Sequence, residues 1–320
     1  MKTAAVVAAI VIQFAVLGWM AGQREWIVRT GPSVWLCTAP VDPRDPFRGD
    51  YVTLGYEIST IPAEKCGPAL RAKMDEMNAT RHWQQETVIF VALDARENGS
   101  AEIVSADLTP PESGLFIKGR VRGSGVHPSG LAGVSYGIDA FFVEQGRGRE
   151  LEQIPKGTPE GMRVPLEMRA AFGSGGTAVL TGYRWGALGI GLKSASETNG
   201  TMEMILHNVS SSPVAVVLPE DQRTLRLRET PGMDVSEPRI PVPFTDGDVR
   251  VVAPGESVAV PVRVRPQWRE RFEDKSWAAF QLVYTAPSAA ECAALKDADK
   301  IWRGSLVSDR FAPRDTVVEE

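Results

Sequence analysis

The chain has 320 residues, with 35 lysines and arginines against 40 aspartates and glutamates, which leaves a net charge of -5 at pH 7. A chain of this length usually forms two domains, and without a basic surplus it lacks the electrostatic footprint of a nucleic-acid-binding protein. Its three cysteines, Cys37, Cys66 and Cys292, are too few for a disulfide framework. We expect them to be small buried residues, with one bridge left open outside the cytoplasm.

An apolar run from Thr3 to Met20 is interrupted only by Gln13. It is long enough to cross the hydrocarbon core of a bilayer as a helix. A signal peptide is the alternative, but the bulky Trp19 and Met20 fit poorly where cleavage requires small residues. We therefore expect residues 1–23 to form an uncleaved transmembrane anchor that makes a single span.

The basic residues around this run do not decide its orientation, because Lys2 precedes it while Arg24 and Arg29 follow it. A very short N-terminal flank with one lysine is typical of a signal anchor. We therefore expect a single-pass protein of the cytoplasmic (inner) membrane, with the rest of the chain outside the cytoplasm.

A strand over residues 34–39 is expected to lead into a proline-stiffened stretch. The residues before Pro43 and Pro46 are kept out of the helical region, so the chain runs extended there. Charges of both signs alternate in this stretch: Asp42, Arg44, Asp45, Arg48 and Asp50. We expect local pairing between them and little net charge.

The Gly49-Asp50 turn introduces a second strand. Every other residue in it is apolar or aromatic: Val52, Leu54, Tyr56 and Ile58. This alternation predicts that the four side chains face the core, while Tyr51 faces the other way and can meet a partner.

Further elements are expected up to residue 155. A short helix is predicted over residues 62–77, and Asn98-Gly99 is typical of a hairpin turn. The predicted strands cover residues 87–93, 101–106, 116–122 and 134–143. Together they favour a small antiparallel β-barrel or sandwich over residues 24–155.

A stretch rich in proline and glycine over residues 156–176 is the expected linker. A second series of short strands follows, separated by turn signals, and favours an immunoglobulin-like β-sandwich over residues 177–312. Its predicted strands cover residues 185–193, 201–208, 215–218, 224–228, 249–252, 257–265, 279–285 and 301–307. Residues 288–298 are expected to contain a short helix, and residues 313–320 a loose tail.

Two separated blocks of this sequence resemble one known family. The run Gly49-Asp50-Tyr51-x-x-Leu54-x-Tyr56 matches the motif of the GDYXXLXY family, which comprises membrane-anchored bacterial proteins of unknown function. The run Tyr136-Gly137-Ile138-Asp139, with the segment Phe142 to Gly148 that contains Glu144 and Gly146, is similar to the second block of that family. The resemblance covers residues 24–155, and Ala140 departs from the aromatic residue expected there. It implies location and architecture, and it implies no reaction.

Asp42, Asp45 and Asp50 could bind a hard cation together with Glu144, because calcium takes several converging oxygens. Arg44 and Arg48 oppose a cation at this position. We therefore expect a knot of salt bridges and hydrogen bonds that pins the loop, without a metal or other cofactor.

A Ser/Lys hydrolase resembling membrane-anchored signal peptidases is one alternative, with Ser33 as nucleophile and Lys65 or Lys118 as base. No lysine stands in a recognisable motif. The histidines His82, His127 and His207 lack the spacing of metal ligands and are expected at the surface or in loops.

The sequence thus predicts a non-enzymatic binding or assembly module on the membrane. The charged loop and Tyr51 would dock on a multi-pass membrane protein or on the cell envelope, and no nucleic acid is expected. The alternatives are the Ser/Lys hydrolase and a sensor domain that binds a small ligand in a barrel mouth.

Overall fold

The computed structural model places most of the chain. The residues that it describes are 2–39, 51–80, 86–95, 99–127, 130–142, 155–194, 202–229, 233–234, 242–274 and 279–312. Within them the protein is mainly β. The strand pairs β1–β12, β2–β10, β12–β13 and β5–β7 are antiparallel. Two large apolar cores organise these strands, one built from residues 34–185 and one from residues 187–311.

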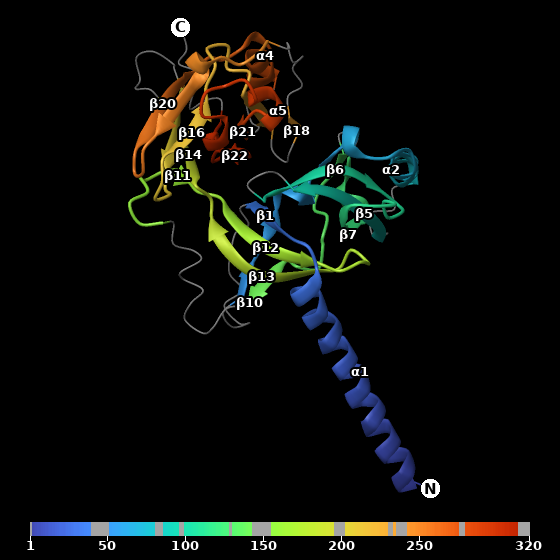
Figure 1. The fold of residues 1–320 in the computed structure, drawn as a ribbon. Coiled ribbons are helices and arrows are strands. Elements are labelled where there is room, and N and C mark those ends of the chain that lie inside the picture. Colours follow the sequence, from blue (N-terminus) through green and yellow to red (C-terminus); the bar gives the residue numbers. More distant parts are fainter. Residues whose placement is uncertain are drawn as a thin grey trace.

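The chain begins with helix α1 (Lys2–Thr30), which projects from the body as a separate rod (Figure 1). Its side chains at residues 6, 7 and 10–26 are exposed. The last hydrogen bond of the helix runs from the Gly31 amide to the Ile27 carbonyl oxygen at 2.8 Å. The next residue is fixed to the body, because the Phe172 amide donates to the Pro32 carbonyl oxygen at 2.9 Å. Within the described residues, no helix meets both the length and the apolarity that a membrane crossing demands.

The first sheet has the strand order β13-β12-β1-β3. Its members are β1 (Ser33–Ala39), β3 (Gly55–Tyr56), β12 (Leu166–Phe172) and β13 (Ala178–Trp185). Leu36 of β1 lies opposite Met168 of β12, and both are fully buried.

The position of β12 corrects the expected linker. Residues 166–172 form an inner strand of the first sheet, and residues 162–163 form the short strand β11 (Met162–Arg163). The glycines at 173–176 belong to the tight turn between β12 and β13, where the Gly173 amide donates to the Thr177 carbonyl oxygen at 2.8 Å. Glycine here marks a hairpin turn, and the two cores meet near residue 186.

A three-stranded sheet of order β6-β5-β7 also contributes side chains to the first core. It consists of β5 (Glu86–Ala95), β6 (Ala101–Asp107) and β7 (Leu115–Arg122), as predicted. Helix α2 (Pro68–Thr80) packs on this core through Leu70, Met74 and Met77. It begins at Pro68, a favoured first helical residue, because residues 61–65 form the strand β4 (Ile61–Pro62) and a 3-10 turn, η2 (Ala63–Lys65).

The strand predicted over residues 134–143 is limited to β10 (Ala140–Phe142). Gly133 and Gly137 adopt positive φ values of 68° and 73°, so the chain turns where a strand was expected. The strand predicted from residue 52 onward is broken as well, into β2 (Tyr51–Thr53), β3 and the turn η1 (Glu57–Ser59). The short strand β9 (Gly130–Leu131) pairs with β8 (Val126–His127) on one side and with β4 on the other.

The second core lies between two four-stranded sheets and a two-stranded one, of orders β11-β14-β15-β20, β18-β17-β21-β22 and β16-β19. The strands are β14 (Leu188–Ser194), β15 (Met202–Asn208), β16 (Val214–Val217), β17 (Leu225–Glu229), β18 (Met233–Asp234), β19 (Val249–Val252), β20 (Ser257–Val262), β21 (Phe280–Thr285) and β22 (Ser305–Val307). These strands follow the predicted series closely. Helix α5 (Ala289–Cys292) lies in the predicted helical connection, and helix α4 (Pro266–Asp274) was not predicted.

Candidate functional site at the motif corner

The two sequence blocks of the motif lie side by side in the structure. Strand β2 from the first block pairs with β10 from the second, with Tyr51 opposite Phe142 and Thr53 opposite Ala140. The Leu54 amide extends this ladder by donating to the Asp139 carbonyl oxygen at 2.8 Å. Residues more than eighty positions apart thus form one corner, which we call the motif corner.

Two tyrosines bind the blocks of the motif corner reciprocally. The Tyr56 hydroxyl of the first block donates to the Ile138 carbonyl oxygen of the second at 2.8 Å. The Tyr136 hydroxyl of the second block donates to the Ile58 carbonyl oxygen of the first at 2.5 Å. Both tyrosines are buried, with 1% and 7% of their surface exposed. Each ring fills apolar space while its hydroxyl satisfies a backbone acceptor of the other block.

The environment keeps both phenols neutral. Burial raises the pKa of Tyr56 and of Tyr136 far above the ordinary tyrosine value, and the nearby negative charge of Asp139 raises both further. The Asp139 carboxylate accepts a hydrogen bond from the Ser135 hydroxyl at 2.6 Å. Neutral phenols of this kind serve as hydrogen-bond donors and do not act as nucleophiles or bases near pH 7.

These shifts predict alkaline sensitivity. A tyrosine whose pKa is raised in the folded state stabilises that state fully below about pH 10, and the contribution is lost as the pH rises above this value. We expect the free energy of unfolding, measured by urea titration, to fall with pH above about pH 10. Tyr136→Phe should flatten that slope and cost about 1 kcal/mol at pH 7 through the lost hydrogen bond. Tyr183→Phe, at an exposed position, is the control, and an unchanged slope in Tyr136→Phe would contradict the assignment.

The remaining predicted site residues divide by position. Leu54 is buried as predicted, and Gly137 has the positive φ of 73° that glycine tolerates best. Tyr51 pairs through its backbone. The other residues lie outside the described part of the chain: Asp42, Arg44, Asp45, Arg48, Gly49, Asp50, Glu144 and Gly146. Among the described residues, no group of three or more histidines, cysteines or carboxylates could hold a metal.

A buried polar cluster on β12 was missed by the sequence reasoning. The Glu167 side chain, from a residue only 5% exposed, accepts hydrogen bonds from Arg184 Nε at 2.5 Å and from the Ser100 hydroxyl at 2.9 Å. The Cys37 thiol lies 3.7 Å from the same carboxylate, and the Arg184 guanidinium lies 4.2 Å from the centre of the Trp35 ring. The available signal was the position of Glu167 between the apolar residues Leu166 and Met168, because a buried charge requires a partner.

This cluster gives a stability prediction. Glu167→Ala leaves Arg184 and Ser100 without their shared acceptor, and loss of hydrogen bonds to a charged group costs about 1.5–3 kcal/mol each. In urea titration we expect Glu167→Ala to lower the free energy of unfolding by at least the cost of one such hydrogen bond, about 1.5–3 kcal/mol. Glu112→Ala, in an exposed loop, is the matched control and should change it by less than about 0.5 kcal/mol. Equal losses in the two variants would show that the cluster does not stabilise the fold.

The Ser/Lys hydrolase gains no support at Ser33. Its hydroxyl accepts hydrogen bonds from Arg169 Nε at 3.2 Å and from Arg169 Nη2 at 3.1 Å. An arginine stays protonated in proteins and cannot serve as the general base that this mechanism needs from lysine.

The cysteines are all free thiols, and Cys66 and Cys292 are buried as expected. Burial raises the pKa of the Cys66 thiol to about 11, so it is a poor nucleophile. The prediction for His207 was wrong. It is buried on β15, where burial lowers its pKa and its Nδ1 lies 2.9 Å from the Ser257 hydroxyl oxygen.

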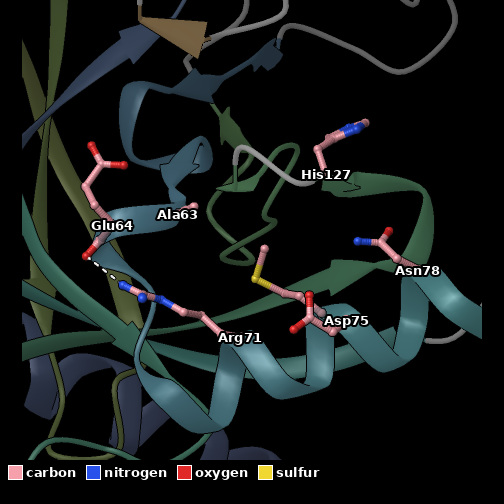
Figure 2. A pocket seen from close by; sticks show the side chains of 7 residues that line it. Ala63, Glu64, Arg71, Asp75, Asn78 and His127 are labelled. Atoms are coloured by element: carbon pink, nitrogen blue, oxygen red, sulfur yellow. Dashed lines mark hydrogen bonds between the residues drawn. The ribbon is translucent and has the colours of Figure 1, made fainter. Parts of the chain in front are cut away.

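A surface hollow of about 310 Å³ lies between α2 and the β8 strand. It is lined by Ala63, Glu64, Arg71, Met74, Asp75, Asn78 and His127. Figure 2 shows His127 across the hollow from the helix that carries Arg71, Asp75 and Asn78. Arg71 is held at one end by hydrogen bonds from its Nε to the Cys66 carbonyl oxygen at 2.7 Å and from its Nη2 to the Glu64 carbonyl oxygen at 3.3 Å. The face of α2 that carries Arg71 and Asp75 thus forms one wall of the hollow.

Comparison with known proteins gives one match. The family model described as GDYXXLXY protein matches residues 13–182, which is more than half of the chain and extends beyond the expected boundary at residue 155 to include β12. No curated protein and no solved structure matches the chain. The matched range contains both blocks of the motif corner and most of the first core. The chain therefore belongs to the GDYXXLXY family.

Proposed function

We propose that the protein is a membrane-anchored, extracytoplasmic binding or assembly module without catalytic activity. The reciprocal hydrogen bonds of Tyr56 and Tyr136 carry this proposal. They hold the hydroxyl groups of Tyr56 and Tyr136 inside the fold, on backbone carbonyls, so neither of these two groups is an activated nucleophile. The motif therefore serves to hold the shape of a corner.

The proposed anchor is α1. Its side chains at residues 10–20 are exposed, and most of them are apolar, as in Ile12, Phe14 and Leu17. Exposing so much apolar surface to water is unfavourable, at about 25 cal/mol per Å², and a bilayer would cover it. The proposed span ends at residue 23, and the last turns of α1 with Gly31 and Pro32 connect it to β1, so the first core would lie close to the membrane surface.

We further propose the finer architecture that the sequence predicts. For the first core this is a small antiparallel barrel or sandwich, and the contact between Phe141 of β10 and Tyr183 of β13, whose ring centroids are 6.3 Å apart, favours the barrel. This contact places β10 beside β13, which is an edge strand of the first sheet. The second core is proposed to be an immunoglobulin-like sandwich.

The proposed docking surface is the open end of the motif corner. Residues 40–50 enter β2 and residues 143–154 leave β10 at the same end of one ladder, because Tyr51 lies opposite Phe142. These two segments carry the charges from Asp42 to Asp50 and Glu144. The partner we propose is a multi-pass membrane protein, with no role for nucleic acid.

Three measurements on the full chain test this proposal. Resistance to alkaline carbonate extraction tests the anchor, and a reporter enzyme fused to the C-terminus tests the orientation. A photoreactive amino acid at Tyr51 should cross-link to a membrane protein, whereas the same group at Val251, exposed on β19, should not. Release by carbonate, or identical cross-links from both positions, would contradict the proposal. A fourth experiment tests the hydrolase alternative. Ser33→Ala should leave the phenotype of cells that depend on this protein unchanged, and a loss of function would instead support the hydrolase.

A small-ligand sensor is the second candidate, favoured by the hollow beside α2. Native mass spectrometry of the detergent-extracted full chain would show a bound small molecule. Its loss in Asp75→Ala and His127→Ala, with retention in Glu273→Ala on α4, would place the ligand in this hollow.

A further inference from the structure

Three basic side chains follow one face of β7. Lys118, Arg120 and Arg122 are exposed, whereas the alternating residues Ile117, Gly119 and Val121 face the first core. Arg120 pairs with Glu86 of β5 at 3.4 Å, and that carboxylate is itself 45% exposed. On β5 and β7 this face carries these three basic side chains against two acidic ones, Glu86 and the exposed Asp94, which leaves a surplus of one positive charge in a protein whose net charge is -5.

Apolar groups lie beside these charges on the same face. The register of the sheet places Phe90 opposite Lys118 and Val88 opposite Arg120. Phe90 and Phe116 are half-buried and form an edge-to-face pair with ring centroids 6.0 Å apart, and Val88 is 39% exposed. Aromatic and aliphatic side chains next to lysine and arginine are the combination found where proteins lie on membrane interfaces.

This face is connected to the end of α1 by direct contacts. The Ile27 side chain lies against Gly173, which begins the β12–β13 turn. The same turn reaches β7, where the Lys118 amide donates to the Gly176 carbonyl oxygen at 2.9 Å and the Phe116 ring lies against Gly176. Figure 1 shows β7 on the side of its sheet from which α1 projects, with β6 on the far side.

We propose that the outer face of β5 and β7 is a second membrane contact, which binds an anionic phospholipid surface. This inference rests on the proposed function, because α1 must hold the first core at the membrane. Lys118, Arg120 and Arg122 attract the lipid phosphates, while Val88 and Phe90 reach the headgroup boundary. The contact orients the first core on the bilayer, in addition to the tether that α1 provides.

The test uses the full chain in lipid nanodiscs. Val88→Cys carries an environment-sensitive fluorophore, and the unsubstituted chain, treated with the same dye, corrects for labelling of the half-buried Cys37. In nanodiscs containing phosphatidylglycerol, the labelled chain is expected to give stronger, blue-shifted emission than in pure phosphatidylcholine. The difference should decrease as salt is added, because salt screens exposed charges.

Two variants then decide the role of the basic residues. Each basic group near an anionic surface raises association about fivefold. Lys118→Gln with Arg122→Gln should therefore lower the docked-to-undocked ratio about 25-fold. Lys156→Gln with Lys193→Gln, two exposed changes outside β5 and β7, removes the same charge, should leave the ratio unchanged and controls for net charge.

The outcomes separate this inference from the proposed function. Carbonate-resistant protein whose emission is the same in both lipids would overturn the second contact and leave the anchor standing. Emission that responds to an added acidic protein but not to anionic lipid would assign the face to a protein partner, and this result would also overturn the second membrane contact. Protein released by carbonate would overturn the anchor first.

Discussion

Leu54→Asp is expected to unfold the first core. Leu54 is 6% exposed and lies at the centre of the motif corner, where its amide binds the Asp139 carbonyl oxygen. Truncating a buried leucine alone costs about 2–5 kcal/mol, and an unpaired buried carboxylate adds several kcal/mol. The sum is comparable with the total stability of a domain, about 5–15 kcal/mol.

Amide hydrogen exchange of the full chain provides the measurement. Protection in β5, β7 and β12 should be lost in Leu54→Asp and should partly return at low pH, where the introduced carboxylate is neutral. Val104→Asp places the same charge on β6 at a residue that is 51% exposed, and it should leave protection intact. Asp50→Ala is expected instead to change the loop and to leave the melting temperature nearly unchanged. Equal melting losses for Leu54→Asp and Asp50→Ala would refute that division.

Trp268→Ala is expected to cause the largest loss in the second core. Trp268 is fully buried on α4, and the Arg265 guanidinium lies 4.9 Å from the centre of its ring. Phe272, one turn later, packs edge-to-face on Phe280 of β21 with ring centroids 4.9 Å apart. Removing a buried tryptophan costs about 3–5 kcal/mol because a large cavity remains.

The result should be local to the second core. Hydrogen exchange should increase in β14, β15 and β21 while β5 and β7 keep their protection, because their apolar contacts belong to the first core. Trp26→Ala, at an exposed residue of α1, is the matched control for tryptophan removal. Simultaneous loss of protection in both cores would show that the chain unfolds as one unit.

Side-chain alternation predicted burial better than it predicted strand continuity. Leu54, Tyr56 and Ile58 all face the core as expected, although the chain breaks between β2 and β3 and then enters a 3-10 turn. Alternation reports which face is buried, whereas continuity depends on the partner strands, and β2 and β3 have different ones. Those partners are distant in sequence and could not be read from the motif.

Strand β12 was missed for a different reason. It lies in the proline- and glycine-rich stretch 156–176 that was expected to be a linker, and the alternation of apolar and polar residues over 166–170 was overlooked there. Its glutamate is buried because Arg184 of β13 and Ser100, the residue before β6, donate hydrogen bonds to it. Helix α4, by contrast, carried readable signals: Pro266 at its first position, and Trp268 and Phe272 four residues apart.

The site was predictable where it depends on local pattern. The two sequence blocks identified the segments that form the motif corner, and the structure pairs them through β2 and β10. The reciprocal tyrosine bonds required a contact across 82 positions for Tyr56 and 78 for Tyr136, which a single sequence does not reveal. The hollow beside α2 also depends on a residue from another strand, His127.

The short junction after α1 has a mechanical consequence. Only Gly31 and Pro32 separate Thr30, the end of the helix, from Ser33, the start of β1. A Cβ atom at Gly31 would lie 2.4 Å from the Phe172 carbonyl oxygen, so the backbone is tightly enclosed there, and the ring of Pro32 restricts its φ. Helix and sheet should therefore turn as one lever. A partner that tilts the helix by a few degrees would swing the remote C-terminal half through a much larger arc.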